Sequence, residues 1–337
     1  MTAPIKDSDR SHWVNRSPLS LRPYLQLSRL DRPVGYWLLA LPGWIGLAFA
    51  SLSHGFAGSD IKWAILILIG AIAMRGAGCT YNDIVDQDLD AQVERTALRP
   101  LPAGTVTTKQ AWIWLFAQCA VGLIVLLCLP RLAQIISLCS IPLVAAYPFM
   151  KRITWWPQVW LGMTFNWAVL VAYAAKTETV SLPLLILYIG LIFWTVGYDT
   201  IYACQDIEDD MKVGVKSTAR RFGKRVKLGV GMSYSMFLIC TALAIHRNGL
   251  NTITGKYLHK YPDENGVVII EPIWIALIMF ISALHLTIQI VRLNPNDPIA
   301  ALGLFKSNIS LGFLLISSLS VPASYIYIVM GILHTPH

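Results

Sequence analysis

The sequence predicts an all-α integral membrane protein with nine transmembrane helices. Three observations predict this class: 55% of the 337 residues are hydrophobic and only 14% are charged, the mean hydropathy is +0.55, and Lys and Arg are distributed asymmetrically between the loops. Soluble domains carry about 25% charged residues, so a soluble protein with a single core is excluded. The same hydrophobic content excludes an intrinsically disordered chain.

Nine apolar stretches are each long enough to cross a bilayer, whose hydrocarbon core requires about 20 residues of helix. Eight of them contain no Asp, Glu, Lys or Arg, and one is interrupted only by Lys62 at its edge and by Arg75 inside it. The expected spans are residues 33–59, 61–82, 110–130, 132–150, 153–175, 179–198, 228–246, 272–291 and 307–337.

The basic residues of the loops predict the orientation of these spans. If the spans alternate, 20 of the 27 Lys and Arg residues lie on the side of the N-terminal segment and six on the other, with Arg75 inside the membrane. By the positive-inside rule the richer side faces the cytoplasm, or the matrix in a mitochondrion. Since these residues are spread over several loops, the net charge of +8 indicates membrane orientation and no nucleic-acid partner.

We expect two regions along the chain. Residues 1–32 form a cytoplasmic or interfacial segment, in which the apolar and basic pattern of residues 19–30 predicts a short helix at the membrane surface. Residues 33–337 form the transmembrane domain, with a polar loop at 247–271 between the seventh and eighth spans. The N-terminal segment contains Asp7 and Asp9 and has no early apolar core, which is typical of neither a secretory signal nor a mitochondrial presequence.

The first acidic cluster follows the second span. At about 100° per residue, its four oxygen-bearing side chains share one face of a helix, and Arg75 returns to within about 20° of the first of them. These four residues are Asn82, Asp83, Asp86 and Asp90. Asp88 points away from this face and is expected in solvent.

The second acidic cluster follows the sixth span. Asp199, Asp206 and Asp210 lie within about 20° of one line along a helix, whereas Glu208 and Asp209 lie off it. Carboxylates at such spacing repel one another unless a cation compensates them. Mg²⁺ favours a few carboxylates together with phosphate oxygens, so two facing clusters predict a site that holds a diphosphate through Mg²⁺. The alternative is that both clusters are surface charges at helix ends.

Basic residues near both clusters are candidate contacts for the diphosphate: Arg95, Arg99, Lys151, Arg152, Lys212 and Lys216. Arg75 differs from them because an Arg inside an apolar span is costly and usually has a functional partner. We expect it to reach the same site.

At these residues the sequence resembles the UbiA superfamily of intramembrane prenyltransferases. The first cluster is similar to the family's NDxxDxxxD pattern and is followed by RPLPAG, while Asp206 and Asp210 match its DxxxD pattern. The segments RLDRPVGYWLL, YPFMKRITWWPQ and GVKSTARRFG resemble the 4-hydroxybenzoate polyprenyltransferase branch.

The resemblance implies nine helices around a central cavity that opens to the lipid, with both motifs above it. It also implies transfer of an isoprenyl group from its diphosphate, bound through Mg²⁺, to an electron-rich aromatic acceptor. One metal would be held by Asn82, Asp83, Asp86 and Asp90. The other would be held by Asp206 and Asp210, with Asp199 as a further ligand or as a base near the phenol.

The resemblance also implies a site for the aromatic acceptor. Arg75 is either a catalytic residue or the partner of an acceptor carboxylate. Candidate pocket residues are Tyr147, Asn166, Trp167 and Tyr198, although aromatic residues in such a protein are more often packing or interface residues.

Three functions remain open at this point. Because the N-terminus lacks a presequence pattern, we favour farnesyl transfer to a phenolic polyketide acid in meroterpenoid biosynthesis, in endomembranes such as the ER or Golgi. The alternative is a 4-hydroxybenzoate polyprenyltransferase of ubiquinone biosynthesis, in a mitochondrial or bacterial inner membrane. From another class, a transporter of anionic substrates would also place charges within helices.

Overall fold

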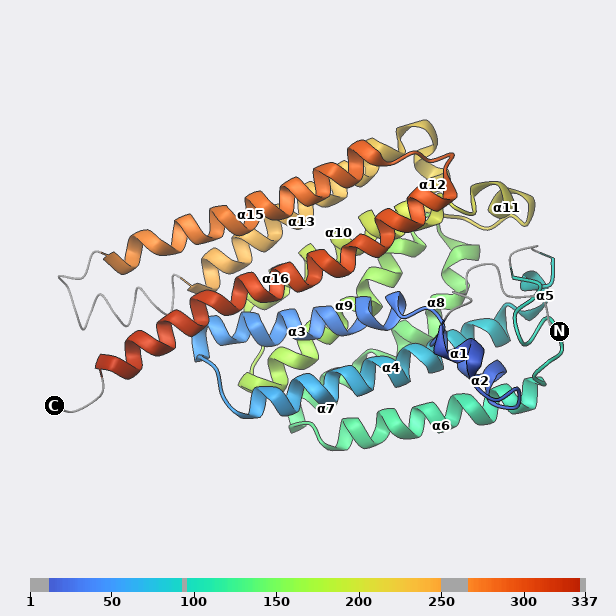
Figure 1. Ribbon diagram of the computed structural model, residues 1–337, viewed down its shortest axis with the longest axis horizontal. Coiled ribbons are helices and arrows are strands. Elements are labelled where there is room, and N and C mark those ends of the chain that lie inside the picture. The colour runs from blue at the N-terminus through green and yellow to red at the C-terminus, as the bar shows by residue number, and fades with distance from the viewer. Residues whose placement is uncertain (1–11, 93–95, 250–265, 334–337) are drawn as a thin grey trace.

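The computed structural model describes residues 12–92, 96–249 and 266–333, and these residues form helices without strands. The long helices run side by side along the long axis of the molecule (Figure 1). They are α3 (Val34–His54), α4 (Ser59–Val85), α6 (Thr108–Leu127), α7 (Arg131–Cys139), α8 (Ile141–Ile153), α9 (Pro157–Thr177), α10 (Leu182–Ala203), α13 (Val226–Gly249), α15 (Gly266–Arg292) and α16 (Pro298–Leu333). The short elements are α1 (Trp13–Arg16), α2 (Arg22–Leu27), α5 (Gln87–Asp90), α11 (Ile207–Lys212), α12 (Thr218–Phe222) and the 3-10 turn η1 (Gly223–Arg225).

The all-α membrane class is confirmed, and each of the nine expected spans overlaps a helix of the described residues. Within the described residues, seven helical segments are long and apolar enough to cross a membrane, so the count of nine is met only in part. The other two spans correspond to α9 and to α15, whose described apolar part is the shorter Ala276–Arg292. Helix α9 contacts α3, α4, α7, α8 and α10, and because neighbouring helices cover it, it can carry more polar residues than a lipid-facing helix.

Two expected boundaries differ from the structure. The span expected at 132–150 is divided into α7 and α8 at Ser140, because Pro142 is favoured in the first turn of a new helix. The polar loop expected at 247–271 falls largely outside the described residues. Helix α13 extends to Gly249, and α15 begins at Gly266.

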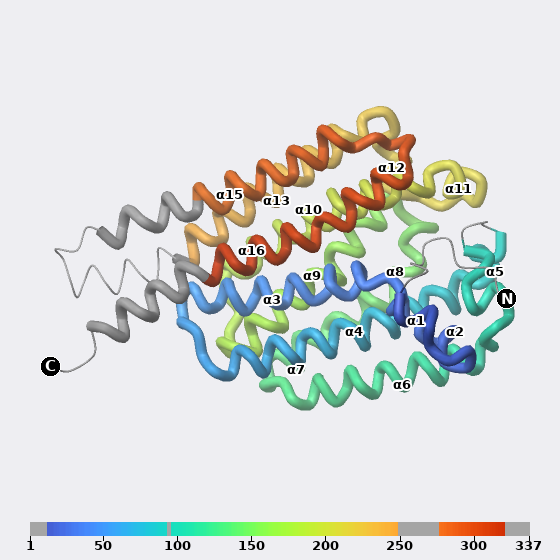
Figure 2. The backbone as a smooth tube through the Cα atoms, viewed as in Figure 1, coloured from blue at the N-terminus to red at the C-terminus, as the bar shows by residue number. Residues whose placement is uncertain are grey.

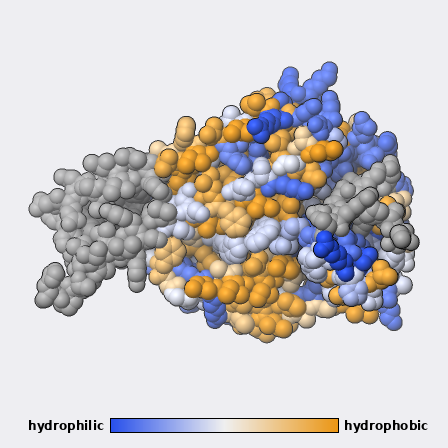
Figure 3. Space-filling model, viewed as in Figure 1, coloured by the Kyte–Doolittle hydropathy of each residue, from blue (hydrophilic) through white to orange (hydrophobic). Residues whose placement is uncertain are grey.

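The short helices lie at one end of the bundle, where hydrophilic residues gather on the visible face, while hydrophobic residues dominate its middle (Figure 3). The N-terminal segment exposes apolar side chains there, with Trp13 57%, Leu19 76% and Leu21 42% accessible, as an interfacial segment requires. It is anchored through Leu27, which packs in a cluster with Val106.

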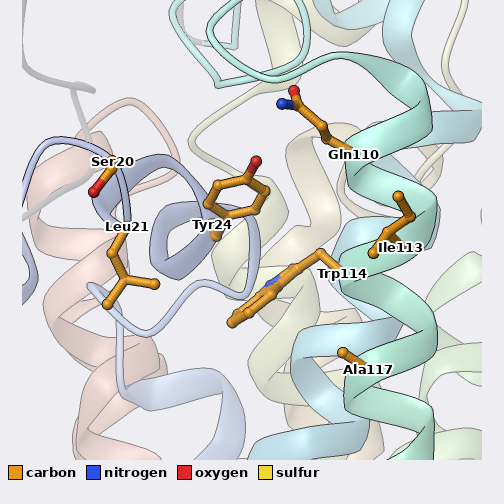
Figure 4. Close-up of a pocket in the computed structure, with 7 residues that line it drawn as sticks. All are labelled: Ser20, Leu21, Tyr24, Gln110, Ile113, Trp114 and Ala117. Atoms are coloured by element: carbon orange, nitrogen blue, oxygen red, sulfur yellow. The ribbon is translucent and has the colours of Figure 1, made fainter.

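An open groove of about 420 Å³ separates α2 from α6 (Figure 4). It is lined by Ser20, Leu21, Tyr24, Gln110, Ile113, Trp114 and Ala117. None of these residues belongs to the acidic clusters, so this groove lies between the N-terminal segment and α6, apart from the acidic motifs.

Helix α10 packs closely against α13 because Gly197 lets the ring of Tyr234 lie against the α10 backbone. The Tyr234 hydroxyl donates to Gln289 Oε1 at 2.6 Å, which fixes the ring from the α15 side. Nearby, Trp194 Nε1 donates to Asn308 Oδ1 at 2.8 Å and joins α10 to α16. Such hydrogen bonds and small residues hold helices together in a bilayer, where helix association lacks a hydrophobic drive.

We predict that Gly197→Ala destabilises the protein. A Cβ at this position would lie 2.2 Å from Tyr234 Cε1, and the ring is held by its hydrogen bond to Gln289. The overlap should cost about 1–3 kcal/mol, measured as a lower midpoint of thermal unfolding in detergent. Gly303→Ala is the matched control, since its Cβ would meet nothing within 4 Å. Equal midpoints for the two variants would contradict the prediction.

Candidate active site

The two acidic motifs lie at the same end of the bundle. The first begins in the last turn of α4 and continues through α5, and the second spans the end of α10 and α11. Figure 2 shows α5 and α11 together at the end that also carries α1, α2 and α12. The expectation that both motifs share one side of the membrane agrees with this arrangement.

In the first motif, Asp86 is 1% exposed, and its carboxylate accepts hydrogen bonds from two cationic side chains in the last turn of α8. Arg152 Nη2 donates to Asp86 Oδ1 at 2.9 Å, and Lys151 Nζ donates to Oδ2. A buried carboxylate is costly unless it is paired, so these two residues neutralise it. The same contacts place two of the expected diphosphate contacts directly on the motif.

Asp90 and Asp83 are joined by a third cation. Arg99 Nη1 lies 2.7 Å from Asp90 Oδ2 and 3.4 Å from Asp83 Oδ1, so the loop after α5 folds back onto the motif. Burial raises the pKa of the Asp90 carboxyl above its ordinary value, and the charge of Arg99 opposes this effect. Asn82 lies half-buried in the last turn of α4, next to Asp83.

Arg29 is a site residue that was not among the sequence-based candidates. Its Nη2 donates to Asp83 Oδ1 at 2.6 Å, and both side chains are buried. Although burial by itself would lower the pKa of Arg29, the carboxylates of Asp83 and Asp31 raise it above its ordinary value. Arg29 has φ +56°, a left-handed conformation that is unusual for a residue other than Gly. The only signal in the sequence was its place at the start of the quoted segment RLDRPVGYWLL.

The second motif is built around α11. Asp206 precedes this helix, and its carbonyl accepts from the Asp210 N–H at 2.8 Å. Arg220 Nη1 donates to the Asp210 carbonyl at 3.0 Å, which ties α12 to α11. Lys212 lies 3.0 Å from the exposed Asp209, so its ammonium contacts a carboxylate outside the motif.

The loop between α11 and α12 is attached to the last turn of α8. The Lys216 N–H donates to the Lys151 carbonyl at 2.9 Å, and Lys216 Nζ donates to the Ile153 carbonyl at 3.1 Å. These bonds connect the second motif with the cationic turn that pairs with Asp86. Arg95 lies outside the described residues.

Deeper in the bundle, Asp199 lies near Arg75 and Tyr147, and each of these side chains is within the electrostatic reach of the others. The side chain of Gln158 interacts with Asp199, and its Oε1 accepts from the Thr218 N–H at 3.0 Å. The carboxylate is therefore oriented from α9, and the same Gln holds the start of α12.

The four candidate acceptor residues divide into two groups. Tyr147 and Tyr198 lie within electrostatic reach of Asp199 and Arg75. The amide of Asn166 is buried and donates to Thr195 Oγ1 at 2.7 Å, joining α9 to α10, and Trp167 Nε1 donates to the Ile136 carbonyl of α7 at 2.8 Å. The structure therefore places the two Tyr residues near the acidic end, while Asn166 and Trp167 connect helices.

The donor set at the acidic end consists of carboxylate and amide oxygens, which are the ligands that Mg²⁺ prefers. Among the described residues, no group of three or more His, Cys, Asp or Glu side chains is placed to hold a metal ion by itself. This arrangement suits Mg²⁺, which keeps several waters and takes phosphate oxygens as further ligands. It does not suit a closed metal site made only of protein groups.

This combination of fold and site is that of a membrane-embedded prenyltransferase. Residues 39–259 match the model of the UbiA prenyltransferase family, and the chain belongs to this family. The enzyme class expected from the sequence, an aromatic prenyltransferase, is confirmed.

Among curated proteins, the chain is similar to the mitochondrial 4-hydroxybenzoate polyprenyltransferase of Homo sapiens, with 41% identity over 307 residues. It is also similar to the protein of the same name from Arabidopsis thaliana, with 46% identity over 218 residues. The matches cover 89% and 64% of this chain, which spans 75% of the human protein and 53% of the Arabidopsis protein.

Solved structures share the fold. A UbiA homologue from Aeropyrum pernix K1 superposes with a TM-score of 0.64 and 24% identity, over 86% of this chain and 98% of the homologue. A UbiA homologue from Archaeoglobus fulgidus, bound to GPP and Mg²⁺, superposes with a TM-score of 0.59 and 19% identity, over 88% of this chain and 99% of the homologue.

The branch favoured from the sequence, farnesyl transfer in meroterpenoid biosynthesis, is wrong. The two curated relatives match over 307 and 218 residues and carry the name of the alternative, 4-hydroxybenzoate polyprenyltransferase. The choice between the branches had depended on the N-terminal segment, a far smaller part of the chain than the matching region.

We predict that Arg29→Met destabilises the protein by leaving Asp83 buried with only its longer contact to Arg99. Removing one partner of a buried ion pair costs about 3–5 kcal/mol. The measurement is the midpoint of thermal unfolding in detergent. The double variant Arg29→Met/Asp83→Leu should recover most of the loss, because no unpaired carboxylate remains. A double variant as unstable as the single one would refute this role for the pair.

Proposed function

We propose that this protein transfers a polyprenyl group from its diphosphate to 4-hydroxybenzoate in the presence of Mg²⁺. The observation that carries this proposal is the meeting of two acidic motifs at one end of the bundle, with Lys151, Arg152 and Arg99 paired to the first. The names of the curated relatives support the choice of acceptor.

The donor diphosphate would bind where the basic residues already gather. Its oxygens can replace the Asp86 carboxylate as partners of Lys151 and Arg152, which frees that carboxylate to serve as a metal ligand. The residues that would hold Mg²⁺ are Asn82, Asp83, Asp86, Asp90, Asp206 and Asp210. When bound, Mg²⁺ supplies positive charge that stabilises the departing diphosphate.

The reaction breaks the bond between the allylic carbon and the diphosphate oxygen and forms a bond to a ring carbon of the acceptor, which then loses its proton. Arg75 is suited to hold the acceptor carboxylate, because a guanidinium matches a carboxylate with two parallel donors. Asp199, oriented by Gln158, is suited to accept a proton from the acceptor. Tyr147 and Tyr198 would border the ring.

The proposed sites for the prenyl diphosphate and for the aromatic acceptor lie at different positions along α4. Arg75 precedes Asn82 by two helical turns, which corresponds to about 10 Å of helix rise. The charged head of the donor would therefore lie at the end of the bundle and the aromatic acceptor deeper in the membrane. The prenyl chain, being apolar, would follow the hydrophobic interior or the bilayer.

The protein is a multi-span integral membrane protein, and we propose a mitochondrial membrane as its location. The curated relatives named above are both called mitochondrial. A mitochondrial location replaces the endomembrane location that was favoured from the sequence, because no comparison supports the latter.

We predict that Asp86→Ala and Asp206→Ala each reduce prenyl transfer by on the order of a hundredfold or more, because each removes a charge that would position the metal and diphosphate. The matched controls are Asp88→Ala and Asp209→Ala. Asp88 is exposed and lies off the first motif, and Asp209 forms its ion pair with Lys212, which is exposed. The measurement is initial rate in liposomes. Near-normal activity in either motif variant would rule out the two-motif site.

We predict that the purified protein converts 4-hydroxybenzoate and a polyprenyl diphosphate to a prenylated acid with release of diphosphate, and that EDTA stops the reaction until Mg²⁺ is restored. Product is measured by mass spectrometry, with donors of increasing chain length and orsellinic acid as a second acceptor. A transporter would release no diphosphate. Preference for orsellinic acid over 4-hydroxybenzoate would contradict the proposed acceptor.

A further inference from the structure

Arg75 lies inside the membrane-spanning helix α4, and its surroundings are specific. Its side chain is half-buried in the middle of α4, while Nε is fully buried and has no hydrogen-bond partner. Among the described residues, no carboxylate oxygen lies within 4.0 Å of an Arg75 nitrogen. The neighbouring Asp199 interacts with it only at longer range.

Two residues on other helices define where the guanidinium lies. At Gly35, in the first turn of α3, an added Cβ would be 2.6 Å from Arg75 Nε, 3.1 Å from Nη2 and 3.2 Å from Cζ. The ring of Phe165 on α9 lies with its centroid 5.2 Å from Arg75 Cζ, a distance at which a cation and an aromatic ring attract each other. The guanidinium thus lies between the bare backbone of α3 and an aromatic ring.

Any side chain at position 35 would occupy the place of the guanidinium. Real Cβ atoms essentially never approach another heavy atom as closely as 2.6 Å, so one group must move. The group that gives way is the end of the flexible Arg75 side chain and not the α3 backbone. Gly35→Ala is therefore expected to leave the fold intact and to displace Arg75.

We propose that Gly35 and Phe165 are positioning residues for Arg75, and that through it they set the preference of the site for an aromatic acceptor with a carboxylate. This inference rests on the proposed function, in which Arg75 holds that carboxylate. A charge-assisted hydrogen bond contributes about 1.5–3 kcal/mol, and its loss corresponds to a tenfold or larger loss of affinity, by the rule of about 1.4 kcal/mol per factor of ten.

The decisive experiment compares Gly35→Ala with Gly43→Ala. Gly43 lies on the same helix, and its Cβ would come 2.7 Å from Ile67 on α4, so the same change crowds the same pair of helices without touching Arg75. We expect Gly35→Ala to raise the KM for 4-hydroxybenzoate by about tenfold while the KM for the prenyl diphosphate changes by less than about twofold. Gly43→Ala should change neither value.

A neutral acceptor provides the second readout. For methyl 4-hydroxybenzoate, as substrate or as competitor of 4-hydroxybenzoate, Gly35→Ala should have little effect, because no carboxylate is present to be held. If the wild-type protein does not prenylate the ester and the ester does not compete with 4-hydroxybenzoate, the KM of the donor serves as the reference. Phe165→Leu should raise the acceptor KM about twofold to tenfold, and Phe165→Tyr, which keeps the ring, should restore it.

The inference is overturned if Gly35→Ala raises the KM of donor and acceptor alike, or if Gly43→Ala reproduces its effect. Failure of the proposed function gives a different result, since the wild-type protein would then not prenylate 4-hydroxybenzoate. In that case the same pair of variants is compared on an aromatic acid that the wild-type protein does accept, and on inhibition by benzoate if it accepts none.

Discussion

The arrangement of this protein depends on the neutralisation of buried carboxylates at one end of a membrane bundle. Asp83 and Asp86 are 0% and 1% exposed, and a charge removed from water is tolerated only with partners that compensate it. Arg29 comes from the segment before α3, Arg99 from the loop after α5, and Lys151 and Arg152 from the end of α8. Segments distant in the sequence are thereby held around one motif.

The same pairing connects stability with the proposed chemistry. Lys and Arg residues that compensate the carboxylates are also suited to bind a diphosphate, while the carboxylates are suited to bind Mg²⁺. If Mg²⁺ and the diphosphate bind together, the carboxylates gain the metal as a partner and the basic side chains gain the diphosphate. Each charge of an existing ion pair then has a new partner of opposite sign, so the charges stay compensated. This explains how an acidic site persists in an apolar protein without a closed metal cage.

Below this layer, single uncharged contacts orient the groups that would act on the acceptor. Gln158 holds Asp199 from α9, and Gly35 with Phe165 encloses the Arg75 guanidinium between α3 and α9. Helix α9 therefore contributes to both sides of the proposed acceptor site, which agrees with its position inside the bundle and its polar residues.

Local sequence was sufficient for the all-α membrane class, the two acidic motifs and the family, because apolar length and the spacing of side chains around a helix are properties of contiguous residues. It did not reveal Arg29 as the partner of Asp83, the attachment of Lys216 to the last turn of α8, or the need for Gly at position 35. These contacts join residues brought together by packing, and no periodicity within one helix encodes them. The branch choice failed for a related reason, because it relied on a short terminal segment, whereas the match to 4-hydroxybenzoate polyprenyltransferases extends over most of the chain.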